Sequence, residues 1–110
     1  MSLESALKPL RALAHPIRWR IVTLLLERPM CVGDLAAVLE LRQPRISDHL
    51  KLLREAGVLE IERRKWLRFY RVSRRCQGLI LSIRNSLGIS AACDPVLGAD
   101  AWNAQRALRS

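Results

Sequence analysis

The sequence holds few of the residues that enzymes use for catalysis. Its 110 residues include two histidines and three cysteines, all far apart, and no glycine-rich loop of the kind that cradles phosphates. No nucleophile, base and orienting group stand at a spacing that would bring them together. We therefore expect a protein that is not an enzyme.

Long apolar runs are also missing. The longest, at residues 21–26, is interrupted by Thr23 and falls far short of the roughly 20 residues that span a bilayer. Glu4 and Lys8 interrupt the first ten residues, which therefore lack the apolar segment of a signal peptide. Three unevenly spaced cysteines do not form a disulfide framework. We expect a cytoplasmic protein with free thiols and no membrane partner.

Acidic residues are scarce relative to basic ones. Ten Asp and Glu stand against 19 Lys and Arg, which gives a formal charge of +9. Residues 42–75 hold 11 of the basic side chains and four of the acidic ones, a net of +7. Because the chain is long enough for only one small domain, an excess of this size favours a polyanionic partner.

Apolar periodicity predicts a mainly α-helical chain. Leu3, Leu7, Leu10 and Ala14 share one helical face, which Pro9 makes imperfect. Further helices are expected at residues 16–28, 31–39, 44–55 and 73–88, ended in the last two cases by Gly57 and Gly88. Alternating residues at 58–61 and 67–72 predict a β-hairpin between the last two of these helices.

The two short helices at 31–39 and 44–55, joined by a tight connection at 40–42, predict a helix-turn-helix, and the hairpin predicts a wing. We expect one DNA-binding and dimerisation domain at residues 1–88, followed by a tail at 89–110 that is either partly helical or mobile. A homodimer is expected because two apolar sets have nowhere else to be buried in so small a domain. These are Leu3, Leu7 and Leu10, and Ile80, Ile83 and Leu87.

In a helix-turn-helix, the second helix enters the major groove, so residues off its apolar stripe contact bases and phosphates. His49 lies on this helix, and the alternative to DNA contact for its side chain is a packing or capping role. The predicted DNA-binding set combines this helix and its start with the wing tip: Arg42, Gln43, Arg45, Ser47, Asp48, His49, Lys51, Arg63, Arg64 and Lys65.

The sequence also resembles a known family. Residues 43–59, QPRISDHLKLLREAGVL, followed by Trp66 and the strand at 69–72, resemble the ArsR/SmtB family of arsenic- and metal-responsive repressors, as does ALAHPIR at 12–18. The resemblance covers about residues 7–75. It implies a winged helix-turn-helix homodimer, joined through its first and last helices, that releases a palindromic operator when an inducer binds. Glu40 and Lys65 stand where many relatives have glycine, a departure expected to shift the loop geometry.

The resemblance also suggests what is sensed. Arsenic-sensing members carry Cys-Val-Cys-Asp-Leu before the recognition helix, and this chain has Cys-Val-Gly-Asp-Leu at residues 31–35. Soft thiolates suit a thiophilic ion, so we expect arsenite or antimonite to bind Cys31 together with Cys76, Cys93 or both, within or across the dimer. A core position is the alternative for Cys76. The helix at 73–88 has no histidine, which excludes the paired zinc site that other members build there.

Two rival interpretations stay open. The same fold could sense oxidants or persulfides through a reversible disulfide between two of the cysteines. The positive charge alone could instead serve an RNA- or membrane-binding module.

Overall fold

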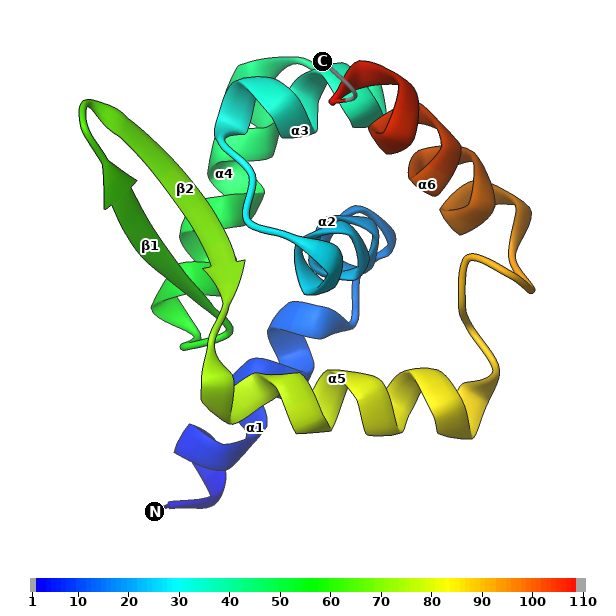
Figure 1. Ribbon diagram of the computed structural model, residues 1–110. Coiled ribbons are helices and arrows are strands. Elements are labelled where there is room, and N and C mark those ends of the chain that lie inside the picture. The colour runs from blue at the N-terminus through cyan, green and yellow to red at the C-terminus, as the bar shows by residue number, and fades with distance from the viewer. Residues whose placement is uncertain (1, 109–110) are drawn as a thin grey trace.

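A computed structural model describes residues 2–108, and these form six helices and one two-stranded antiparallel hairpin (Figure 1). The predicted mainly α-helical fold with a hairpin wing is confirmed. In chain order, the elements are α1 (Leu3–Leu13), α2 (Pro16–Glu27), α3 (Val32–Leu39), α4 (Gln43–Glu55), β1 (Leu59–Arg64), β2 (Leu67–Val72), α5 (Arg74–Leu87) and α6 (Pro95–Ala107). No helix in the described range is long and apolar enough to cross a membrane.

Three helices begin at a side chain that accepts a backbone hydrogen bond. The Ser2 hydroxyl accepts from the Ser5 amide, His15 Nδ1 accepts from the Ile17 amide, and the Asp94 carboxylate accepts from the amides of Val96 and Leu97. Each bond satisfies an amide that the first turn of a helix leaves free. Local side-chain hydrogen bonds therefore stabilise the starts of α1, α2 and α6.

The core lies between α2, which occupies the centre of the molecule, and the helices around it (Figure 1). Ile21 and Val22 of α2 are fully buried, as are Leu35 of α3 and Ile46 of α4. Ile80 of α5 also belongs to this core, with 1% of its surface exposed, so the expectation that it is free to form a dimer surface is wrong. One side of α5 therefore packs against the core of its own domain.

Two residues hold a left-handed backbone without being glycine. Glu40, which ends α3, has a φ of 57°, and Lys65, in the hairpin turn, has a φ of 59°. Most L-amino acids avoid this region because of steric crowding at Cβ. Both positions therefore keep a backbone conformation that glycine favours, although neither residue is glycine.

The hairpin is anchored at its base and free at its tip. Leu59 pairs with Val72 at one end, and Arg64 pairs with Leu67 beside a two-residue turn of Lys65 and Trp66. At the base, Met30 exchanges two backbone hydrogen bonds with Tyr70, of 2.8 and 3.1 Å, which ties the hairpin to the segment before α3. No sequence pattern predicted this pairing of Met30 with the hairpin.

Residues 89–108 pack against the domain. Within them, α6 contacts both α2 and α3, and its Asp100, which is 3% exposed, forms two hydrogen bonds of 2.9 and 3.0 Å with the Arg20 guanidinium of α2. This pairing raises the pKa of Arg20. The tail was expected to be either partly helical or mobile. Residues 95–107 are helical, and residues 109–110 lie outside the described range.

The ion pair predicts how α6 depends on one carboxylate. Replacing Asp100 with Ala leaves the Arg20 guanidinium without its partner and should lower the free energy of unfolding by roughly 3 kcal/mol, as for other buried pairs. Urea denaturation measures this. The matched control is Asp94→Ala, which removes only the α6 cap and should cost about 1 kcal/mol. Equal losses in the two variants would contradict the role given to Asp100.

Candidate nucleic-acid interface

The helix α4 has one buried and one exposed face. Ile46, Leu50 and Leu53 are buried against the core, and this stripe fixes the rotation of the helix about its axis. The side chains between them point outward and are exposed, as predicted: Gln43, Arg45, Ser47, Asp48 and Lys51. They present amide, guanidinium, hydroxyl and ammonium groups, which can hydrogen-bond to base edges and phosphates.

The connection from α3 to α4 presents the start of α4 to solvent. Its left-handed residue Glu40 reverses the chain, and Arg42 then caps α4 with an extended backbone and no side-chain bond to the helix. Pro44 lies in the first turn, where its missing N–H costs nothing. The positive end of the helix dipole and the exposed guanidinium of Arg42 together favour an anion here.

The three predicted wing-tip cations are not equivalent. Arg64 forms an ion pair with Glu62 at 2.8 Å and covers the ring of Phe69 at 4.9 Å. Arg63 and Lys65 have no ion-pair partner in the part of the chain that the structure describes, and both are exposed. Of these three cations, Arg63 and Lys65 are therefore the two whose charge is not neutralised by an ion pair.

His49 differs from the rest of the predicted set because it is half-buried. Its ring lies 4.8 Å from the ring of His15, between centroids, and its Nδ1 lies 3.4 Å from Arg18 Nη1. A guanidinium can only donate, so this contact needs a neutral His49 with its proton on Nε2. The geometry supports the packing alternative, in which His49 holds α4 against the start of α2.

Comparisons with known proteins agree with this geometry. Residues 15–60 match the profile of the family described as bacterial regulatory protein, arsR family. The crystal structure of the transcriptional repressor BigR from Xylella fastidiosa superposes with a TM-score of 0.65 and 30% identity, over 76% of this chain and 86% of that one.

This chain belongs to the arsR family. It is 48% identical over 61 residues to the HTH-type transcriptional repressor SmtB of Mycobacterium tuberculosis, covering 56% of this chain and 45% of that protein. It is 43% identical over 75 residues to the arsenical resistance operon repressor of Escherichia coli, covering 66% and 63%. The chain thus spans about half the length of the curated relatives that it matches.

The three cysteines of this arsR-family chain lie on different elements. Cys31 caps α3, is half-buried and makes no side-chain bond to the helix. Cys76 is buried in α5 and its thiol donates to the Gly57 carbonyl at 3.6 Å, whereas Cys93 is exposed between α5 and α6. Within residues 2–108 no three His, Cys, Asp or Glu side chains are grouped so that they could hold a metal ion. One chain alone therefore does not supply a three-ligand site.

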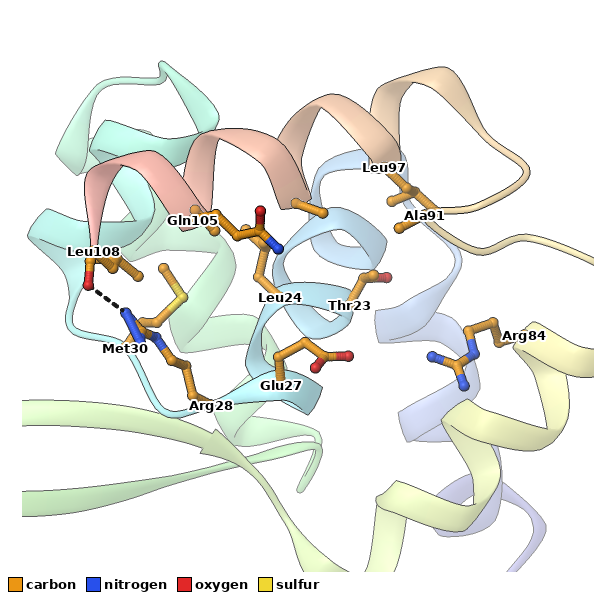
Figure 2. A pocket seen from close by; sticks show the side chains of 12 residues that line it. Thr23, Leu24, Glu27, Arg28, Met30, Arg84, Ala91, Leu97, Gln105 and Leu108 are labelled. Carbon is orange, nitrogen blue, oxygen red and sulfur yellow. Dashed lines mark hydrogen bonds between the residues drawn. The ribbon is translucent and has the colours of Figure 1, made fainter.

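A cavity of about 600 Å³, which the sequence did not predict, lies between α2, α5 and α6 (Figure 2). Leu24, Leu97 and Leu108 contribute apolar surface, and Glu27 of α2 and Arg84 of α5 extend toward it from different helices. None of the predicted DNA-binding residues or cysteines lines this space. It exists because α6 folds back onto α2.

The histidine pair predicts a pH dependence of stability. Burial lowers the pKa of both His15 and His49, with a further decrease from Arg18 and Arg45; His49 also feels the His15 ring, and Asp48 opposes its shift. The unfolded chain then takes up protons at higher pH than the folded one. Stability should therefore fall as the pH drops below about 6.5, the ordinary histidine value.

Urea denaturation at pH 7.5 and 5.5 checks this. The variant His49→Asn should lose less stability between the two values than the unmodified chain. In His15→Asn, the new side chain keeps a capping oxygen and should also flatten the dependence. Identical pH profiles for all three proteins would show that carboxylates, and not this pair, govern the acid sensitivity.

Proposed function

We propose that this chain is a transcriptional repressor that binds operator DNA as a homodimer. The observation that carries the proposal is the exposed polar and basic face of α4, held by a buried stripe on its other side and flanked by a wing with two free cations. All three relatives described above are named repressors. In this reading α4 contacts bases in the major groove while Arg42, Lys51 and the wing contact phosphates.

The dimer part of the proposal is supported by exposed leucines. Leu3 and Leu10 of α1 are 75% and 41% exposed, and Leu81 and Leu87 of α5 are 37% and 68% exposed. Large apolar side chains in such numbers on two helices favour burial against another protein surface. Two copies joined there would present two α4 helices to a palindromic site.

Direct readout by α4 can be tested with one charge removed at a time. Arg45→Ala should weaken binding to the preferred duplex about 5- to 150-fold for each half-site, the range of one good base contact, and relax preference at one position of each half-site. Arg106→Ala, which removes the same charge from the exposed surface of α6, should have little effect. Fluorescence anisotropy on the chain's own promoter fragment measures both.

The same titration tests the assembly. Two chains should bind each duplex, and scrambled DNA or RNA of equal length should bind more weakly. A stoichiometry of one chain per duplex would refute the dimer. Equal affinity for operator, scrambled DNA and RNA would refute the repressor and leave a module that binds by charge alone.

We further propose that a thiol-binding inducer, trivalent arsenic or antimony, acts through Cys31. The position of Cys31 supports this, because Cys31 caps the start of α3. A Cβ atom added at Gly33 would lie 3.9 Å from the Cys31 sulfur and 3.8 Å from the side-chain amide nitrogen of Gln43, at the start of α4. An inducer held at this thiol is therefore close to both helices of the motif. Further ligands would come from Cys76 or Cys93 of the same chain or from the second protomer of the proposed dimer.

Reduced protein carrying Cys31→Ser should stay on the operator at arsenite concentrations that release the unmodified protein. In the unmodified protein, coupling of the usual size between arsenite binding and DNA binding should lower operator affinity about 5- to 150-fold. Cys93→Ser tests the exposed candidate ligand in the same way, and loss of release in this variant as well would make Cys93 a second ligand. Gly33→Cys should lower the arsenite concentration needed, because it restores a second sulfur beside the first.

The outcomes separate the two classes of signal. Release of the Cys31→Ser variant at the same arsenite concentration as the unmodified protein would refute this site. Release by peroxide or polysulfide, with the matching mass change and no response to arsenite, would assign the cysteines to redox sensing. Neither result would affect the binding test of Arg45.

A further inference from the structure

The tip of the hairpin carries an exposed indole. Trp66 is 87% exposed, more than any other large apolar side chain in residues 2–108, and the adjacent Leu67 is 49% exposed. With Lys65, Trp66 forms the two-residue turn itself, and this turn is the end of the hairpin that stands away from the helices (Figure 1). Nothing in the described chain covers it.

Charge around this apolar patch indicates what can cover it. Arg63 and Lys65 precede the indole, Arg68 follows it, and these three exposed cations have no ion-pair partner within the described residues. Lys65 holds its place at a φ of 59°, where glycine would be unstrained. An apolar tip surrounded by cations fits a polyanion that also offers apolar surface, and duplex DNA offers base-pair steps between its phosphates.

The reach of the hairpin selects the groove. Strands of six residues extend about 20 Å, and the hairpin projects from the same side of the molecule as α4 (Figure 1). When α4 lies in the major groove, the next groove along the duplex is the narrow minor groove. Phosphate contacts by Arg63 and Lys65 on its walls leave the indole facing the floor.

We propose that Trp66 is a wedge that inserts into the minor groove beside the α4 contact and partly unstacks one base-pair step. The proposal rests on the proposed function and adds to it a preference for deformable steps, such as pyrimidine–purine, at positions that α4 does not touch. Trp66 thereby contributes to specificity through the shape and stiffness of the DNA.

Two binding properties distinguish a wedge from a charged contact. Trp66→Ala should weaken operator binding about 10- to 100-fold, as loss of base–aromatic contact does elsewhere, and should leave the dependence on salt concentration unchanged. Lys65→Ala should instead reduce the log–log salt slope by about 2, because the dimer loses one phosphate contact in each half-site. The matched control is Trp102→Ala, since Trp102 is 61% exposed on α6, and it should not change DNA binding.

Insertion itself can be observed with 2-aminopurine placed in turn at each flanking position of the operator. The unmodified protein should raise its fluorescence at one step per half-site, because unstacking relieves quenching. Trp66→Ala should abolish that signal and Trp66→Phe should keep part of it. Replacing the pyrimidine–purine step with a stiff A-tract should lower the affinity of the unmodified protein more than that of Trp66→Ala.

If the unmodified protein binds the operator, but Trp66→Ala binds with equal affinity and no aminopurine position responds, the wedge is refuted and the repressor stands. If the unmodified protein shows no preference for any duplex, the proposed function itself fails. Loss of binding in Trp66→Ala with an altered salt slope would also overturn the wedge, because it would assign the residue to placing the cations.

Discussion

Burial of one stripe of α4 is the constraint on which the DNA-binding surface depends. Ile46, Leu50 and Leu53 are each at most 1% exposed, and burial of side chains of this size stabilises the fold by about 1.5–3 kcal/mol each. A rotation of α4 that exposed them would cost several times that amount. The polar residues between them are held outward by the same packing, so the chemistry of the interface follows from the core.

Glu40 and Lys65 adopt the left-handed backbone that the two turns need, although neither residue is glycine. Both connections need a chain reversal that a left-handed residue provides, and the surrounding helices and strands impose it on side chains that disfavour it. Strain of this kind persists only where the neighbouring structure determines the backbone. At the wing, the strained residue is Lys65, an exposed cation next to the exposed indole of Trp66. The strained position is therefore part of the proposed DNA-binding surface.

The proposed inducer-binding thiol and α6 lie outside that surface. Cys31 begins α3, whereas α6 joins α2 and α3 through Asp100 and through Asn103, whose amide donates to the Val38 carbonyl at 3.3 Å. Because α3 packs against both α6 and α4, a change at either place would reach α4 through direct contacts. Of the relatives named above, the arsenical resistance operon repressor has a name that states a signal and the other two do not, so family membership alone does not define a signal for this chain.

The sequence determined the elements, because local signals suffice for them. Apolar spacing located α1 to α5, prolines and glycines marked their ends, and alternation with a basic turn located the hairpin. The exposed positions of α4 followed from the same period, since residues off a buried stripe must face outward.

Contacts between distant residues were decided only by the tertiary structure. The pairing of Arg20 with Asp100, the bridge from Met30 to Tyr70 and the packing of His49 on His15 join positions whose partners no spacing rule identifies. The burial of Ile80 and Cys76 likewise depends on which side of α5 meets the core. Periodicity defines the apolar face of a helix, but it does not say whether that face meets its own domain or a second copy.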